Sequence, residues 1–203
     1  MVLDQRIRPE PSEANPDEPL SIEYVPMSEE QYLALPEQPK AEWVNGVAIL
    51  MPPASWPHGA AAVKISSLLD RSLPTAIVLS ESGLRIYETS RSYRVPDIMV
   101  LDHPPTDRVW IDDPPVAVVE VLSPGTITND LLFKSVEYAN LGIRQYWVVN
   151  PETRTVSVYG NKGGTWDENA IAVVDENDPE AELAVGELGT VRLVLDQVFG
   201  PKR

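Results

Sequence analysis

The chain has 203 residues, of which 43% are hydrophobic and 23% charged, values that are ordinary for a globular protein long enough to bury a core. It contains no cysteine, which excludes disulfides, thiolate metal sites and a cysteine nucleophile. Its net charge of −15 argues against a protein that binds nucleic acid through a broad basic surface. Most of the negative charge, however, lies outside residues 41–150.

The N-terminal segment differs in composition from the rest of the chain. Residues 1–20 are rich in Pro, Glu and Asp, which predicts a disordered acidic tail. We expect residues 21–200 to form a single domain. The sequence shows no apolar signal segment and no run approaching the ~18 apolar residues of a membrane helix. The expected location is therefore the cytoplasm, with no membrane partner.

The first part of this domain carries three local signals. Ser28, with Glu and Gln in the following turn, predicts a short capped helix. The pair Asn45-Gly46 lies between apolar residues and predicts a hairpin with a type I′ turn. From Trp56 to Leu73, small and apolar residues recur at helical spacing until a proline follows, which predicts a longer helix.

The second part consists mainly of strands. A helix is expected over 128–142, ending at Gly142, and a loop over 103–115. After residue 160 we expect short irregular strands and a terminal helical turn. Runs of strands broken by single helices indicate an α/β (α+β) fold with a mixed central β-sheet flanked by helices. The strand patterns lie at 75–88, 93–102, 116–122, 144–150 and 155–160.

Two of these predicted strands contain an acid where an apolar residue would be expected. Asp97 interrupts "YRVPDIMVL" and Glu120 interrupts "VAVVEVL". Side chains alternate along a strand, so Glu120 shares a face with Val118 and Leu122. If neighbouring strands align these faces, the two carboxylates converge and need a cation. A site with oxygen ligands only suits Mg²⁺ or Mn²⁺.

Lys134 lies in the helix that follows the second acid, where its ammonium could reach back over the sheet and stabilise charge on a phosphate. Ordinary interpretations remain open for each residue alone. A strand acid is more often exposed or part of a structural salt bridge, and a helix lysine is more often solvated. The combination of two interrupted strands and a lysine-bearing helix is more informative than any one member.

Several segments together resemble a known family. They are "AEWVNGVAILMPPASWPHG", "RVPDIMVL", "VVEVLSPGTITNDLLFK" and "EYANLGIRQYWVVNP". In combination they are similar to the Uma-two family of restriction endonucleases, also called domain of unknown function 820, within the PD-(D/E)XK nuclease superfamily. The resemblance runs from about Met27 to Tyr159. It implies a restriction-endonuclease-like core and a nuclease-like domain over residues 21–200.

The resemblance also implies roles for particular residues. Asp97 and Glu120 correspond to the two motif acids, with Glu42 as an additional acid and Lys134 as the lysine of the catalytic set. The implied metal ligands are Asp97, Glu120 and Val121, for Mg²⁺ or Mn²⁺. The sequence departs from the simplest superfamily pattern at Leu122, where that pattern has its lysine.

Four further residues are candidates for a supporting role around this set. His58 resembles a recurrent histidine of the family, although a histidine in the first turn of a helix needs no function. Ser123 is equally explained by the turn before Pro124, and Tyr138 by the core. The supporting candidates are His58, Ser123, Asp130 and Tyr138.

The leading functional hypothesis is a Mg²⁺-dependent endodeoxyribonuclease that acts on DNA as a homodimer. An alternative is a catalytically inactive nuclease fold used to bind DNA or a protein partner, which the net charge of −15 favours. A third hypothesis is glycoside hydrolysis by paired carboxylates, which requires an aromatic cleft that stacks on the sugar. It ranks below the other two hypotheses because most aromatic residues lie in predicted core strands.

Overall fold

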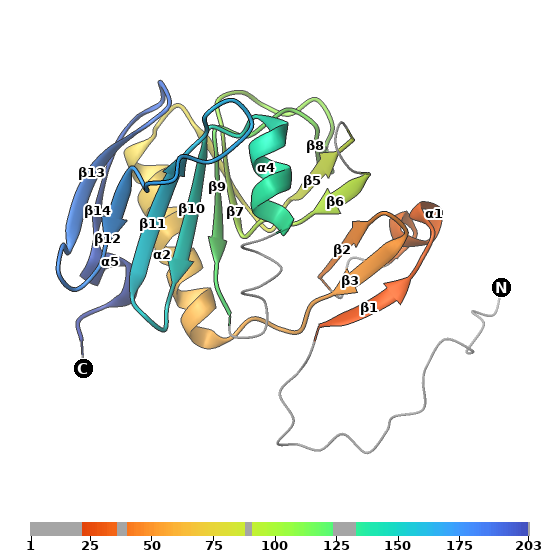
Figure 1. The fold of residues 1–203 in the computed structure, drawn as a ribbon, viewed down its shortest axis with the longest axis horizontal. Helices are drawn as coiled ribbons and strands as arrows, with labels where there is room; N and C mark the ends of the chain where they lie inside the picture. Colours follow the sequence, from red (N-terminus) through yellow and green to blue (C-terminus); the bar gives the residue numbers. More distant parts are fainter. Residues whose placement is uncertain (1–21, 36–39, 88–90, 124–132, 203) are drawn as a thin grey trace, which may run out of the picture.

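The computed structural model describes residues 22–35, 40–87, 91–123 and 133–202. Within these ranges the strands form two six-stranded mixed sheets and one two-stranded hairpin (Figure 1). The mixed α/β architecture is therefore confirmed, with the strands divided between two sheets rather than gathered in one. No helix in the described part of the chain is long and apolar enough to cross a membrane.

The first sheet has the strand order β1-β3-β2-β6-β5-β8, and only the β5–β8 pair is parallel. The short helix α1 (Glu29–Leu33) packs beside it, with Ser28 and Gln31 forming a capping box. The strands are β1 (Glu23–Pro26), β2 (Ala41–Val44), β3 (Val47–Leu50), β5 (Gly83–Ile86), β6 (Ser92–Arg94) and β8 (Trp110–Ile111).

The second sheet has the order β12-β11-β10-β9-β7-β4, and only the β9–β10 pair is parallel. The hairpin β13–β14 leads into the terminal helix α5 (Leu195–Phe199). These strands are β4 (Ile77–Ser80), β7 (Ile98–Leu101), β9 (Ala117–Val121), β10 (Gln145–Asn150), β11 (Thr155–Gly160), β12 (Ala172–Val174), β13 (Glu180–Val185) and β14 (Gly189–Val194).

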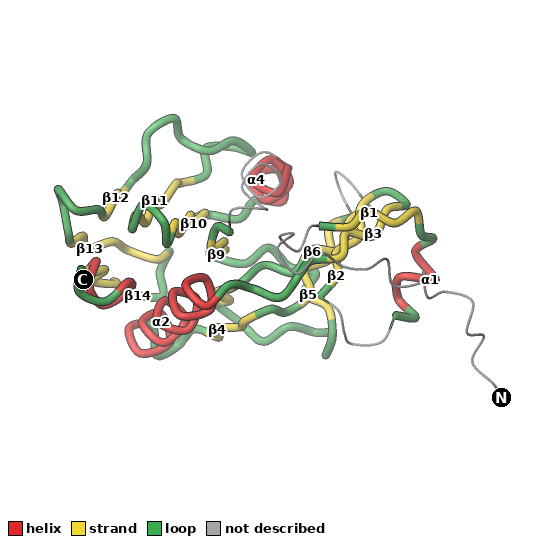
Figure 2. Tube along the Cα trace, turned by 90° about the horizontal axis from the view of Figure 1, so that it is seen from below, coloured by secondary structure: helices red, strands yellow, loops and turns green. Residues whose placement is uncertain are grey.

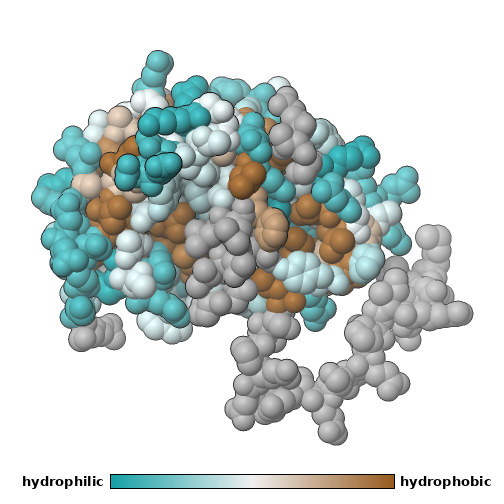
Figure 3. Space-filling model, in the orientation of Figure 1, coloured by the Kyte–Doolittle hydropathy of each residue, from teal (hydrophilic) through white to brown (hydrophobic). Residues whose placement is uncertain are grey.

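Helices cover both faces of the second sheet. Figure 2 shows α2 (Trp56–Ser72) on one side of β9 and β10 and α4 (Ser135–Leu141) on the other. Side chains alternate along the strands, so Val119 and Val121 pack in the cluster with α2, whereas Val118 and Leu122 pack in the cluster with α4. Figure 3 shows hydrophilic side chains along the outer edge near the hairpin.

Several predicted elements are confirmed. The β2–β3 hairpin turns at Asn45 and Gly46, whose φ angles of 46° and 92° suit a type I′ turn. The long helix runs from Trp56 to Ser72 behind the Ser55 cap. Gly142 ends α4 in the left-handed conformation, while the first part of the predicted helix, 128–132, lies outside the described residues.

Other predicted elements were wrong in detail. The segment 93–102 was expected to be one strand, but it is divided between β6 in the first sheet and β7 in the second. Pro96 accounts for the break because it has no N–H to continue a ladder. The segment 75–88 divides in the same way at Glu81, whose φ is +49°. The predicted loop 103–115 contains β8, which pairs with β5.

Candidate active site

The two acids that interrupt the predicted strands lie opposite each other in the second sheet. Antiparallel pairing of β7 with β9 matches Ile98 with Val119, and the next pair in that register is Asp97 with Glu120. Both side chains are buried: Glu120 lies on the face covered by α4, whereas Asp97 contacts His58 of α2 and the N–H of Val121. The two acids therefore lie at the same end of adjacent strands.

Lys134 lies in the turn that leads into α4, and its ammonium contacts Glu120. The Nζ atom is 3.3 Å from Glu120 Oε1 and 2.9 Å from Glu42 Oε1. Only 4% of Lys134 is exposed, so it is not a solvated helix lysine. One turn later the hydroxyl of Tyr138 donates to Glu120 Oε1 at 2.8 Å. Burial and the charge of Glu120 raise the pKa of Tyr138 well above 10, which keeps it a proton donor.

Glu42, on β2, is the point at which the first sheet meets this site. Its Oε1 accepts the N–H of Val95 at 3.0 Å as well as the ammonium of Lys134, and its Oε2 accepts Arg94 Nη1 at 2.9 Å. Burial alone would raise the pKa of Glu42, but the charges of Lys134 and Arg94 and the Val95 N–H lower it to about 2. Glu42 is thus an ionised, buried anchor for Lys134.

Asp97 has donors on both carboxylate oxygens. The N–H of Val121 donates to Oδ2 at 2.8 Å, while Lys40 Nζ and His58 Nε2 lie 3.0 and 3.4 Å from Oδ1. His58 Nδ1 in turn shares a hydrogen bond of 3.2 Å with the hydroxyl of Ser123. Burial opposes ionisation of Asp97, but the hydrogen bond from His58 and the charge of Lys40 outweigh it and lower the pKa of Asp97 below its usual range.

Nearly all of the residues singled out in the sequence are brought together here. They form two adjacent groups, Asp97 with His58 and Ser123, and Glu120 with Lys134, Glu42 and Tyr138. Asp130 lies outside the described residues. The position two residues after the second acid is filled by Leu122, which packs in the apolar cluster under α4. The ammonium at Glu120 comes instead from α4.

The sequence analysis missed two basic residues of the site. Arg94 joins Glu42 to Glu137 of α4, with Nε and Nη2 at 2.8 and 3.0 Å from the Glu137 oxygens. Lys40 contacts Asp97. One signal was available for Lys40, because residues two apart on a strand share a face and Lys40 precedes Glu42 by two. Arg94, a basic residue inside a strand pattern, could have been noted for the same reason as the acids.

The donor set fits a hard divalent cation in type. Within the described residues, no three His, Cys, Asp or Glu side chains converge closely enough to hold a metal by themselves. Mg²⁺ needs no such cluster, because it keeps several waters and accepts one or two carboxylates. Asp97 and Glu120 are the two carboxylates here that could serve as such ligands. Val121, whose carbonyl the sequence resemblance implies as a further ligand, lies beside Asp97, to which its N–H donates.

Comparison with known proteins defines the class of fold and then the family. The chain is similar to the structure described as a putative nuclease belonging to DUF820 from Anabaena variabilis, with a TM-score of 0.65 and 22% sequence identity over 84% of this chain and 96% of that one. This similarity confirms a nuclease-like mixed α/β fold.

The family itself is shown by sequence. Residues 29–191 match the model of Uma2, whose description is "Putative restriction endonuclease", and the chain therefore belongs to this family. The match confirms the resemblance drawn from the motifs and extends it from Tyr159 to β14. Among proteins with curated annotation, no significant match is found.

Proposed function

We propose that the protein is a metal-dependent endonuclease that hydrolyses phosphodiester bonds in DNA, using Mg²⁺ or Mn²⁺. The observation that carries the proposal is that Asp97, next to β7, and Glu120, on the adjacent β9, lie at the same end of one strand pair, with the ammonium of Lys134 at 3.3 Å from Glu120. Burying two acids and a lysine costs desolvation free energy, and perturbed ionisable groups cluster at functional sites. Membership of the Uma2 family supports the same chemistry.

The proposed roles follow from the contacts. Asp97, Glu120 and the carbonyl of Val121 would hold the metal, which when bound polarises a phosphoryl oxygen and lowers the pKa of a water. Lys134 supplies a fixed positive charge next to Glu120 that can stabilise charge on the phosphate. Tyr138 holds the Glu120 carboxylate in place, and His58 does the same for Asp97. Glu42 fixes the position of Lys134.

The experiment is cleavage of plasmid DNA by the purified protein with Mg²⁺ or Mn²⁺. We expect Glu120→Gln and Asp97→Asn to lower the rate by at least about 100-fold, since even partners outside the ligand shell of a metal cost 10- to 100-fold. Glu180→Gln is the matched control, because Glu180 lies on β13 in an exposed pair with Arg192. Failure of the unmodified protein to cut any form of DNA or RNA would refute the proposal.

We further propose that the active form is a homodimer. Cutting both strands of a duplex requires hydrolysis of two phosphodiester bonds, and one chain offers one set of Asp97, Glu120 and Lys134. Sedimentation should give a particle of twice the 22.5 kDa chain mass. Linear plasmid should then form without a long-lived nicked intermediate. A monomer that only nicks would contradict the dimer and leave the nuclease activity standing.

A second candidate is a nuclease fold that has lost catalysis and only binds DNA or a protein partner. One observation favours it: Lys134 and Lys40 already neutralise Glu120 and Asp97. Calorimetric titration with Mn²⁺ separates the candidates. Heat of binding that disappears in Glu120→Gln supports the nuclease, whereas absence of binding supports the inactive fold.

A further inference from the structure

Lys40 occupies a position that the nuclease proposal does not use. It follows residues 36–39, immediately before β2, and its Nζ lies 3.0 Å from Asp97 Oδ1 and 3.3 Å from Glu81 Oε1. Its charge also interacts with Glu120. A single ammonium thus lies within the field of both acids that we propose as metal ligands. Such a position is favourable for any cation, whether it is a side chain or a free ion.

The contacts of Asp97 indicate that Lys40 and a divalent ion would compete for its carboxylate. Its Oδ2 accepts the Val121 N–H, and its Oδ1 faces Lys40 and His58. A divalent ion that took Oδ1 as a ligand would meet a positive charge at about hydrogen-bond distance. The repulsion between two cations at that oxygen favours displacement of one of them.

Exposure indicates which basic group can move. The side chains of Lys134 and Arg94 are each 5% exposed, whereas that of Lys40 is 25% exposed. Lys134 and Arg94 each contact a second buried or largely buried carboxylate, so moving either would leave a buried charge without its partner. A lysine side chain with access to solvent can withdraw its ammonium at low cost.

Glu81 provides the withdrawn ammonium with a partner. Its carboxylate is already 3.3 Å from Lys40 Nζ and its side chain is 61% exposed. Its backbone is held beside the site, because its N–H donates to the carbonyl of Asp97 at 3.2 Å and its φ is +49°. A non-glycine residue in the left-handed region is uncommon and is often found near functional sites.

We propose that Lys40 is a built-in competitor of the catalytic metal. Lys40 neutralises Asp97 when no metal is bound and moves toward Glu81 when a divalent ion binds. This rests on the metal site of the proposed nuclease. Lys40 then lowers the affinity for metal below the value that the carboxylate pair alone would give. The site would bind metal only at a higher concentration of free divalent ion than it would need without Lys40.

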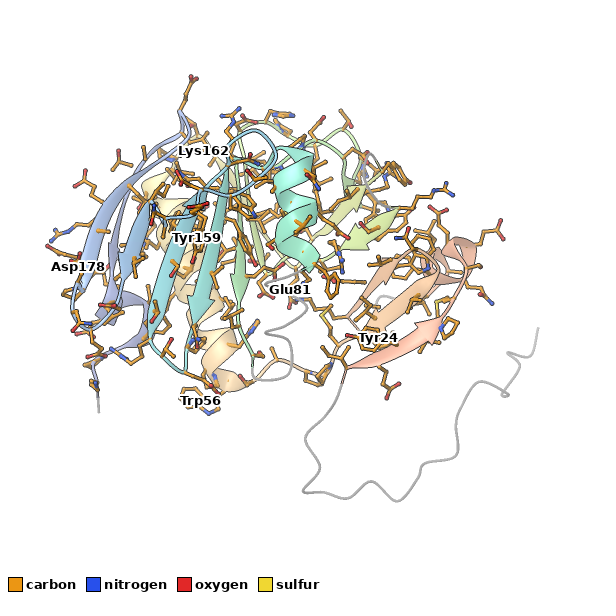
Figure 4. All side chains as sticks on the ribbon, viewed as in Figure 1. Tyr24, Trp56, Glu81, Tyr159, Lys162 and Asp178 are labelled. Carbon is orange, nitrogen blue, oxygen red and sulfur yellow. The ribbon has the colours of Figure 1, made fainter. Side chains whose placement is uncertain are left out.

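The test is calorimetric titration of Mn²⁺ into the full-length protein. We expect Lys40→Met to bind Mn²⁺ about tenfold more tightly, the order of one partly buried ion pair no longer in competition. Lys162→Met is the matched control, since it also removes one lysine and one ion pair, with Asp167, at a position far from Glu81 (Figure 4). The control should stay within about twofold, because distant exposed charges are screened.

A double-mutant cycle tests whether Lys40 competes with Mn²⁺ by moving to Glu81 or only changes the net charge near the site. Glu81→Gln should weaken Mn²⁺ binding when Lys40 is present, because the displaced ammonium loses its partner. In the Lys40→Met background the same substitution should have a smaller effect. Melting curves in the presence of chelator verify that each variant is folded, and Lys40→Gln serves as a second variant with a polar side chain.

The outcomes distinguish this inference from the proposed function. Equal Mn²⁺ affinities of the unmodified protein and Lys40→Met would overturn the competitor and leave the nuclease intact. Tighter binding in Lys40→Met, without any cleavage of DNA, would support the competitor and overturn the nuclease activity. Absence of Mn²⁺ binding in every variant would overturn both.

Discussion

At the scale of single residues, the site depends on buried charges that neutralise one another. Glu120 lies in an apolar strand, where an unpaired carboxylate would cost several kcal/mol. Lys134 and Tyr138 offset part of that cost by contacting its Oε1. Lys134 is in turn shared with Glu42, which also holds Arg94. Removing one member therefore leaves another without its partner, and the network acts as a unit.

Glu42→Gln tests this network through the pH dependence of stability. The pKa of Glu42 is about 2 in the folded protein and 4.5 in a free side chain. Ionised Glu42 therefore stabilises the folded state above pH 4.5, and this contribution is lost as the pH falls toward 2. The variant should be less stable than the unmodified protein at neutral pH by about 3 kcal/mol.

The measurement is urea unfolding of both proteins over a series of pH values, from neutral down to the onset of acid unfolding. The stability difference between them should narrow as the pH falls below 4.5. A difference that stays constant with pH would mean that the effect of Glu42 is steric rather than electrostatic.

Residues of the site differed in how readily the sequence revealed them. Asp97 and Glu120 stand out because each is an acid in an apolar run, where only a specific partner makes the residue tolerable. Lys134 was indicated by its place in the helix after the second acid and by the family resemblance, since nothing local distinguishes it from a solvated lysine. Lys40 and Arg94 were missed because their partners are distant in sequence, such as Asp97, 57 positions after Lys40.

At the scale of elements, α4 is the component whose position matters most for the site. The Trp166 indole donates to the Ser135 carbonyl at 2.8 Å, and the amide of Asn161 donates to the carbonyls of Ala139 and Ile143. Arg94 holds Glu137 from the first sheet. These contacts tie both ends of a seven-residue helix, which is too short to be stable alone. Lys134 is thereby fixed at the start of α4.

Two glycines give a paired test of helix stability. Gly142 ends α4 with φ +88°, and an added Cβ would meet nothing within 4 Å, so Gly142→Ala acts through the backbone alone. We expect it to destabilise the fold by about 1 kcal/mol. Gly59 lies within α2, also with open space around a Cβ, and Gly59→Ala should stabilise by about 0.5–1 kcal/mol. Thermal melting of both variants measures the difference. Equal shifts of the two melting temperatures would contradict the assignment of Gly142 as a left-handed cap.

The sequence predicted elements well where local chemistry decides them. The Asn45-Gly46 turn and the helix beginning after Ser55 depend on residues next to each other. It failed where the choice of partner strand decides. The two sides of Pro96 read as one strand, yet β6 and β7 join different sheets because the chain passes between them at Asp97. Which sheet a strand joins depends on tertiary packing, which the periodicity of its sequence does not encode.

At the scale of the whole molecule, the buried charges join the two sheets. Glu42 and Arg94 come from the first sheet, Glu120 from the second, and Lys134 and Glu137 from the region of α4. The chain also crosses between the sheets near Glu81 and near Asp97, and the Glu81 N–H to Asp97 carbonyl bond links the two crossings. Separating the sheets would expose buried ionised groups and strip them of their partners.

We therefore predict that residues 21–200 unfold as a single cooperative unit. Unfolding one sheet alone would leave charges such as Glu42 and Lys134 buried without partners, which is strongly unfavourable, so a half-unfolded species should not accumulate. Calorimetry should give equal calorimetric and van't Hoff enthalpies. Hydrogen exchange read by mass spectrometry should report the same free energy of opening for β2 in the first sheet and β9 in the second. Two separated transitions, or slower exchange confined to β9–β11, would instead define two independent folding units and remove the structural reason for Glu42 to be ionised and buried.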